Sequence, residues 1–159
     1  MTILTLLFII LDIASKLIVS KYMSLNETIV IIKKFLNITY VHNTGVAWSM
    51  FSHNSFLVVI ISLAVIMGIL LYIKNNNPDS VTEKFAYSLV LGGALGNFIN
   101  RIIFGYVIDF IDVKIFNYDY PIFNLADIFI VVGVFMLVIY TWRKENGNRS
   151  KRKWRFKNR

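Results

Sequence analysis

Two aspartates, Asp109 and Asp127, lie inside apolar runs of the sequence, "GYVIDFID" at 105–112 and "FNLADIFIVVG" at 123–133. An isolated ionised carboxylate costs about 3 kcal/mol or more in apolar surroundings, so such groups are usually paired, protonated or near water. When two carboxylates are brought together, one keeps a proton and the other can act as a base. The base would activate water to attack a carbonyl, and the acid would hydrogen-bond the carbonyl oxygen. The pair therefore predicts the chemistry of an aspartic peptidase.

Other hydrolytic chemistries fit the sequence less well. The chain has no cysteine and two scattered histidines, His42 and His53, and it lacks an HExxH motif, so no zinc site or other metal is predicted. Ser15 and Lys16 are neighbours, but adjacent residues on a helix point about 100° apart and make a poor nucleophile–base pair. No phosphate-binding glycine loop follows a strand, and no cofactor is expected.

The elements that position these residues follow from hydropathy. The chain has 159 residues, of which 57% are hydrophobic, with a mean hydropathy of +0.62, whereas about 45–50% is usual for soluble domains. Segments at roughly 1–20, 55–73, 85–104 and 122–142 approach the ~20 residues that span a bilayer as a helix. The first lacks the basic start and cleavage site of a secretory signal, so we expect a retained helix. The predicted fold is an all-α membrane protein with four transmembrane helices.

Residues 35–43 mix Ile, Tyr, Val, Thr and Phe in loose alternation, which predicts a small β region between the first two helices. Strand-like backbone cannot face lipid, so we expect this region on the extracytoplasmic surface. "KNNNPDS" at 74–80 predicts a turn between the second and third helices.

Charge predicts the orientation and a tail. Of the 17 Lys and Arg residues, nine lie in 143–159, so the chain divides into a membrane domain at 1–142 and a basic cytoplasmic tail at 143–159. Placing the tail and the 74–84 loop inside gives eleven basic residues inside and four outside, which predicts that both termini are cytoplasmic. The tail could bind nucleic acid, but anionic membrane lipid explains it without a further partner. Nothing in the sequence specifies an oligomeric state, and a monomer is expected.

This orientation places the intramembrane polar residues together near the outer leaflet. Polar and ionisable residues within a membrane span indicate a functional site. Asp12 and Lys16 have the i,i+4 spacing of a local ion pair. Asn97 and Arg101 repeat that spacing and could brace the site or bind an anionic group. Asn124 could cap the fourth helix or hydrogen-bond the carboxylate of Asp127.

Three further interpretations are structural. Gly92 and Gly96 are spaced to allow close helix packing. Asp112 and Asp119 are expected to be solvated in the outer loop. His42 and His53 are expected at the membrane interface.

Five motifs resemble the lipoprotein signal peptidase (signal peptidase II) family of bacterial membrane aspartic peptidases. In chain order they are "DIASK" at 12–16, "NTGVAW" at 43–48, "GGALGNFINR" at 92–101, "GYVIDFID" at 105–112 and "FNLAD" at 123–127. The resemblance covers nearly all of the chain before the tail. It implies a catalytic pair formed by Asp109 and Asp127, with supporting roles for Asp12, Lys16, Asn43, Gly45, Asn97, Arg101, Asn124 and Ala126.

The resemblance also implies a substrate and a place in the cell. The substrate would be a diacylglyceryl-modified prolipoprotein, cleaved just before the lipidated cysteine by an enzyme in the bacterial cytoplasmic membrane. The sequence departs from the family pattern at position 100, where Asn100 replaces Asp beside Arg101. The alternative is a proton-coupled small membrane transporter or channel that uses the same carboxylates as a relay.

Overall fold

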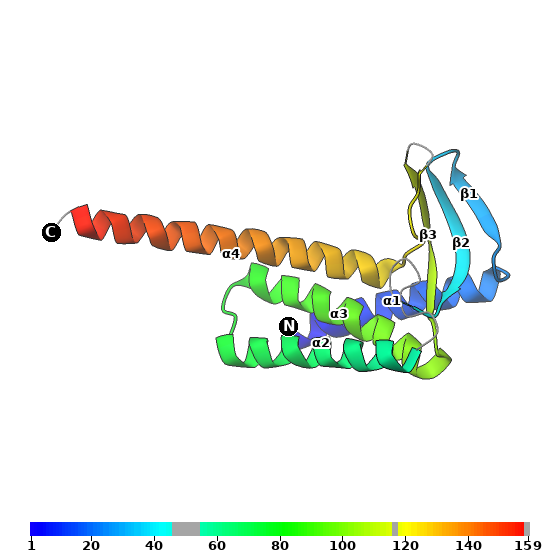
Figure 1. The fold of residues 1–159 in the computed structure, drawn as a ribbon, viewed down its shortest axis with the longest axis horizontal. Helices are drawn as coiled ribbons and strands as arrows, with labels where there is room; N and C mark the ends of the chain where they lie inside the picture. Colours follow the sequence, from blue (N-terminus) through cyan, green and yellow to red (C-terminus); the bar gives the residue numbers. More distant parts are fainter. Residues whose placement is uncertain (46–54, 116–117, 158–159) are drawn as a thin grey trace.

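The computed structural model describes residues 1–45, 55–115 and 118–157 of the chain. Within these ranges it contains helices α1 (Thr2–Tyr22), α2 (Ser55–Asn76), α3 (Val81–Phe104) and α4 (Leu125–Lys157). It also contains strands β1 (Thr28–Ile32), β2 (Leu36–Asn43), β3 (Val107–Ile115) and β4 (Tyr118–Asp119) (Figure 1).

The described residues include four helices long and apolar enough to cross a membrane, which confirms the predicted spans. Two helices begin elsewhere than predicted. α3 begins at Val81, just after the 74–80 turn, and α4 begins at Leu125 because Phe123 bonds to the backbone of Ile111 and cannot join the helix. α4 continues without a break through residue 143 to Lys157, well beyond the other helices in Figure 1.

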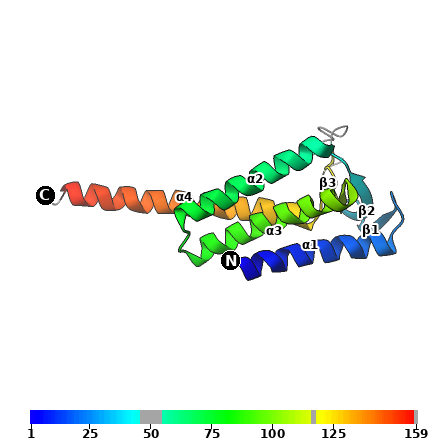
Figure 2. The same cartoon turned by 90° about the horizontal axis from the view of Figure 1, so that it is seen from below.

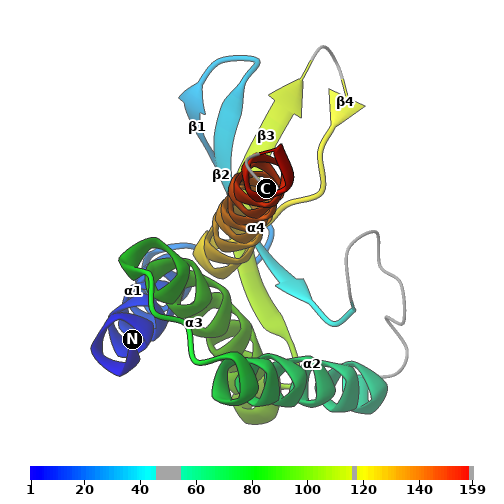
Figure 3. The ribbon, with the colours of Figure 1, turned by 90° about the vertical axis from the view of Figure 1, so that its left-hand side faces the viewer.

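Helix α3 is the centre of the bundle, since it packs against α1, α2 and α4 (Figure 3). One apolar cluster joins α2 to α3 through Ile66, Ile73, Tyr87 and Leu91. The outward surfaces of α1, α2 and α4 carry exposed Leu, Ile, Val and Phe side chains, as expected for surfaces in contact with lipid.

Glycines on α3 allow its close approach to α1 and α4. A Cβ atom at Gly92 would overlap Phe8 of α1, and one at Gly96 would overlap the carboxylate of Asp12. A Cβ at Gly93 would overlap the backbone carbonyl of Ala126 at the start of α4. The predicted role of Gly92 and Gly96 in helix packing is confirmed.

The strands form one antiparallel sheet in the order β1-β2-β3-β4. β1 and β2 confirm the predicted β region between the first two helices. β3 and β4 come from residues 107–119, for which the sequence predicts only an outer loop; β3 pairs with β2, and β4 pairs with β3. α3 ends at Phe104, and the next residue, Gly105, has a φ of +78° that lets the chain reverse from the helix into β3.

The sheet lies across one end of the bundle, with its strands roughly perpendicular to the helices (Figure 1). Both chain termini lie at the opposite end (Figure 2). If the helices cross a bilayer, the strands therefore run parallel to the membrane plane at one of its surfaces.

The close contact of α3 with α4 gives the first testable prediction. Gly93→Ala should destabilise the protein by about 1–3 kcal/mol, because the added methyl group meets the rigid carbonyl of Ala126. Thermal unfolding in detergent micelles measures this as a lower Tm. The matched control is Gly68→Ala on α2, where a Cβ meets nothing within 4 Å and alanine favours the helix. Equal Tm changes in the two variants would contradict the packing described here.

Candidate active site

Asp127 occupies the first turn of α4, where the helix start and Asn124 hold each other in place. The backbone N–H of Asn124 donates to Oδ2 of Asp127 (3.0 Å), and the backbone N–H of Asp127 donates to Oδ1 of Asn124 (3.2 Å). This reciprocal arrangement is a capping box built from Asn and Asp. Both predicted roles of Asn124, capping the helix and bonding the carboxylate, are therefore confirmed. A carboxylate in this position is also favoured by the helix dipole.

Asp109 lies on β3, and its side chain is only 2% exposed. Nδ2 of Asn124 donates to its Oδ1 (2.6 Å), and Nδ2 of Asn43, on the neighbouring strand, donates to its Oδ2 (2.8 Å). Burial raises the pKa of Asp109 to about 6, with a further contribution from the charge of Asp127, while the two amide donors and Lys16 oppose the rise. Asn124 thus bonds to both carboxylates, to Asp109 through its side-chain NH₂ group and to Asp127 through its backbone N–H.

A buried ion pair on α1 extends the network. The Lys16 ammonium bonds to Oδ2 of Asp12 and to Oδ1 of Asn97, both at 2.7 Å, which confirms the predicted i,i+4 pair. Because Lys16 can only donate, it fixes the Asn97 amide with its oxygen toward α1 and its NH₂ toward α4. That NH₂ group donates to Oδ1 of Asp127 (2.8 Å), so the ion pair determines which group the Asp127 carboxylate meets.

The remaining supporting residues also reach this centre. Oδ1 of Asp12 accepts the backbone N–H of Ala126 (3.0 Å), the residue before Asp127. Nη2 of Arg101 donates to the carbonyl of Gly45 (3.2 Å), and Nε of Arg101 is buried without a hydrogen-bond partner among the described residues. The Arg101 charge interacts with both Asp109 and Asp127. The structure therefore brings together every residue singled out for the site in the sequence.

Asn100 supports β3 from α3. It is 3% exposed, and its Oδ1 accepts the backbone N–H of Ile108 (3.3 Å), the residue before Asp109. A carboxylate oxygen at this position could accept the same bond, so the amide keeps the backbone contact and omits a negative charge.

The interpretation of Asp112 as a solvated residue was wrong. Asp112 is 9% exposed, and its Oδ2 accepts hydrogen bonds from Asn37 (3.0 Å) and Thr39 (2.9 Å) of β2. Sequence reasoning missed this contact because it did not predict β3, whose pairing with β2 places Asp112 opposite Asn37. The polar alternation of Asn37 and Thr39 in "LNITYVHN" was the available signal.

His42 and His53 were expected at the membrane interface. His42 is half-buried, stacks on the ring of Tyr106 at 3.7 Å and is hydrogen-bonded to Tyr40. His53 and residues 46–48 of the "NTGVAW" motif lie outside the described residues. Asp119 is placed on β4, but its side chain is not among those described.

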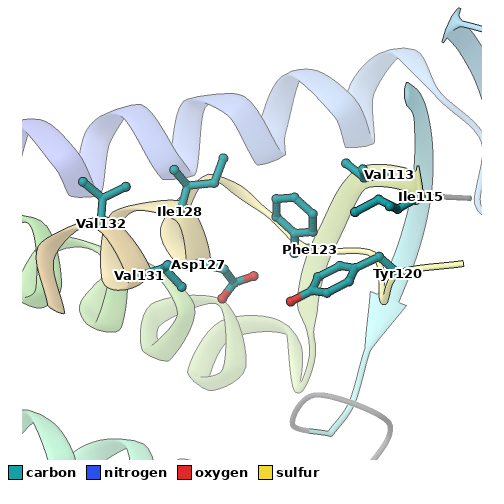
Figure 4. A pocket seen from close by; sticks show the side chains of 8 residues that line it. All are labelled: Val113, Ile115, Tyr120, Phe123, Asp127, Ile128, Val131 and Val132. Atoms are coloured by element: carbon teal, nitrogen blue, oxygen red, sulfur yellow. The ribbon is translucent and has the colours of Figure 1, made fainter. Parts of the chain in front are cut away.

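An apolar groove of about 370 Å³ opens beside Asp127 (Figure 4). Its walls are hydrophobic side chains of β3, the segment at 120–123 and α4. Asp127 and Tyr120 are its polar members, and in Figure 4 the Tyr120 hydroxyl points toward the side on which the Asp127 carboxylate lies. The lining residues are Val113, Ile115, Tyr120, Phe123, Asp127, Ile128, Val131 and Val132.

Two alternative site types find little support in this geometry. The Ser15 hydroxyl donates to the backbone carbonyl of Asp12 (2.7 Å), while the Lys16 ammonium is held by Asp12 and Asn97, so the two groups bond to different atoms. Within the described part of the chain, no three His, Asp or Glu side chains are grouped so that they could hold a metal ion.

Comparison with known proteins places this arrangement in a family. The family model for signal peptidase (SPase) II matches residues 4–143. Proteins named lipoprotein signal peptidase are similar: one from Anoxybacillus flavithermus is 43% identical over 86% of this chain and 82% of its own length. One from Halothermothrix orenii is 40% identical over 90% and 95%, and one from Staphylococcus aureus is 35% identical over 90% and 88%.

Two solved structures share the fold. Both are described as bacterial membrane enzymes, solved by the in meso method at 2.3 and 1.9 Å resolution. The first superposes with a TM-score of 0.84 at 33% identity and covers 92% of this chain and 89% of that one. The second has a TM-score of 0.79 at 34% identity, with coverages of 88% and 90%.

Four apolar helices, a sheet across one end and a buried cluster of carboxylates define a multi-pass bacterial membrane enzyme. The chain belongs to the signal peptidase II family, as the resemblance of its motifs indicated.

The corrected environment of Asp112 gives the second prediction. Asp112→Ala should lower the free energy of unfolding by about 1–3 kcal/mol, because it leaves the buried amide of Asn37 without its acceptor. Thermal unfolding of the purified protein measures the change. Asp79→Ala, at an exposed position in the turn before α3, is the control and should leave the Tm unchanged. Equal Tm values for the two variants would show that the Asp112 bonds contribute nothing to stability.

Proposed function

We propose that this protein is an aspartic endopeptidase that removes the signal peptide from diacylglyceryl-modified prolipoproteins and cleaves just before the lipidated cysteine. The observation that carries the proposal is the pair of carboxylates, Asp109 and Asp127, beside an apolar groove. Both accept hydrogen bonds from one residue, Asn124, Asp109 from its side chain and Asp127 from its backbone. Family membership supports the substrate class, because the relatives named above are lipoprotein signal peptidases.

The two carboxylates take different roles in this proposal. Asp109 holds the proton, since burial raises its pKa to about 6, and it donates a hydrogen bond to the oxygen of the scissile carbonyl. Asp127 is the base that takes a proton from the attacking water. The resulting tetrahedral intermediate collapses when Asp127 passes the proton it took from water to the amide nitrogen; the C–N bond then breaks and the signal peptide leaves with the new carboxyl group.

The surrounding amide groups hold the two carboxylates in position. Asn97 and Asn124 both present N–H groups to Asp127, and Asn43 and Asn124 present N–H groups to Asp109. Because these N–H donors are already in position, they do not have to reorient during the reaction. The Asp12–Lys16 pair acts at one remove, because it orients Asn97 and anchors the backbone before Asp127.

The groove suits the lipid portion of such a substrate. Its volume falls within the range of about 300–1,000 Å³ typical of ligand pockets, and its walls are almost entirely hydrocarbon. An acyl chain lying between α4 and the sheet would place the neighbouring peptide bond near Asp127, one of the residues that line the groove (Figure 4). The groove thereby links the lipid on the substrate to the position of cleavage.

The proposed orientation has both termini in the cytoplasm and the site at the outer leaflet. The termini lie at the end of the bundle opposite the sheet (Figure 2), and the Lys and Arg count favours that end as the cytoplasmic one. Residues 143–159 then form the basic cytoplasmic tail and 1–142 the membrane domain. Membership of the signal peptidase II family favours peptide cleavage over the alternative of a proton-coupled transporter.

The third prediction tests the pair directly. Asp109→Asn and Asp127→Asn should each reduce cleavage of a lipidated model prolipoprotein by at least a factor of about 10², or about 3 kcal/mol, because neither amide can exchange a proton with water. Turnover is measured by gel mobility of the substrate, per amount of enzyme that elutes as a single species in gel filtration.

The control for these variants is Asp79→Asn, at an exposed position at the far end of the bundle, which should keep full turnover. Substantial cleavage by Asp127→Asn would show that the wrong pair has been assigned. Loss of turnover in the control would show that the assay reports something other than the site.

The fourth prediction concerns pH. Asp109 ionises as pH rises through about 6, so the singly protonated pair is lost and kcat/KM should fall, by up to about tenfold per pH unit, above that value. Bound substrate displaces water from the groove, so the corresponding fall in kcat should occur at a higher pH. A kcat/KM that instead rises through pH 6 would show that Asp109 must be ionised.

A further inference from the structure

The register of the sheet sorts its side chains into two faces, because residues directly opposite each other on neighbouring strands point to the same side. One set of partners joins Ile29 to Ile38 and Ile111, and Ile32 to Leu36 and Val113. The other set joins Thr28 to Thr39, and Val30 to Asn37 and Asp112. Among these partners the first face carries only apolar side chains, and the second face is largely polar.

Hydrogen bonds confirm the second face. The Thr28 and Thr39 hydroxyl groups are 3.0 Å apart, and Thr39 and Asn37 both donate to Asp112. Side chains on three adjacent strands are therefore linked on one side of the sheet. A one-residue slip would exchange the two faces, and these bonds oppose it.

The apolar face lies on the side of the sheet that faces the membrane-spanning helices. Val113 and Ile115, on that face of β3, line the groove together with Ile128 and Val131 of α4. Val131 is 67% exposed on a helix long enough to span a bilayer, so its surroundings are lipid. The underside of the sheet thus continues the lipid-facing surface of α4.

The outer part of this face extends beyond the helices. β1 and β2 extend sideways from the end of the bundle in Figure 1, and on this face Ile29 and Ile32 are 45% and 50% exposed. The five residues at 23–27 link α1 to β1 and can span at most about 18 Å, so β1 remains near the membrane surface. Lys33 and Lys34, both exposed, form the tip of the hairpin.

We propose that the side chains of the apolar face insert into the lipid leaflet at this end of the bundle while the strand backbone stays at the level of the headgroups, with Lys33 and Lys34 binding the phosphates of anionic lipids. A flat element with an apolar face and basic residues at its edge is the pattern of an interfacial membrane anchor. This face would fix the height of β3, and with it Asp109, relative to the bilayer. The proposal does not depend on the chemistry of the site.

A second copy of the chain is the competing occupant, since β1 is an edge strand whose outer side could pair with another strand. Positive charge at the hairpin tip disfavours a like-charged copy and favours anionic lipid. The absence of cysteine from the chain allows each position to be probed with a single introduced label.

The experiment places a nitroxide at one cysteine in the full-length protein reconstituted in nanodiscs. Ile29→Cys and Ile32→Cys report on the apolar face, and Val30→Cys, one residue away on the polar face, is the matched control. Collisions with oxygen, which concentrates in lipid, and with a nickel chelate, which stays in water, are measured for each label. Nanodiscs of phosphatidylcholine alone are compared with nanodiscs containing phosphatidylglycerol, with and without the change Lys33→Gln/Lys34→Gln.

We expect oxygen collisions to dominate at 29 and 32 and nickel collisions to dominate at 30. Phosphatidylglycerol should move the labels at 29 and 32 deeper, and the double Gln change should abolish that shift. Nickel collisions dominating at all three positions would overturn the proposal. Protection from both reagents, with spin–spin broadening that grows with the number of copies per disc, would assign the face to a second copy. If phosphatidylglycerol did not change the depth of the labels at 29 and 32, the proposed binding of Lys33 and Lys34 to anionic lipid would be wrong.

Discussion

The site depends on one constraint, the buried ammonium group of Lys16. A lysine has donors and no acceptor, so Asp12 and the carbonyl oxygen of Asn97 must both face it. The NH₂ group of Asn97 then faces Asp127, and its oxygen also accepts an N–H of Asn124, whose own NH₂ group reaches Asp109. A single charge on α1 therefore determines the orientation of two amides and the donors that two carboxylates on other elements receive. A buried network of this kind stabilises one arrangement when every member is satisfied, and partial removal is costly.

Close packing is what allows so many polar groups to bond with one another instead of with water. Gly96 leaves room for the carboxylate of Asp12, and Gly93 lets the first turn of α4 lie against α3. With larger residues at these positions, the hydrogen bonds of Asp12 to Ala126 and of Asn97 to Asp127 would lengthen beyond useful range. The hydrogen bonds of the polar residues therefore depend on the small residues, which let the helices approach closely, as is common where helices pack within a membrane.

Sequence reasoning recovered the parts of the structure that depend on local spacing. The four spans follow from hydropathy, the Asp12–Lys16 pair from its i,i+4 spacing, and the cap at Asn124 from its place one turn before Asp127. It did not recover β3 or the burial of Asp112, because both depend on pairing between segments about 70 residues apart in the chain. "VIDFIDVKI" lacks clear alternation since most of its residues are buried on both faces, and such a strand resembles any short apolar run. The groove beside Asp127 likewise exists only once α4 and the sheet meet.

The position of the ion pair on one helix bears on how the protein enters the membrane. Asn97, which completes the shell around Lys16, follows it by 81 residues, so it reaches the bilayer only after α1 and α2 have been made. A lone lysine on α1 would meet the hydrocarbon long before any partner from α3 arrived. Asp12 lies one turn away on the same helix, so the segment carries its own counter-ion and is electrically neutral at these two positions. The first helix can therefore insert independently of the rest of the chain, and biogenesis can proceed from the N-terminus while the site assembles last.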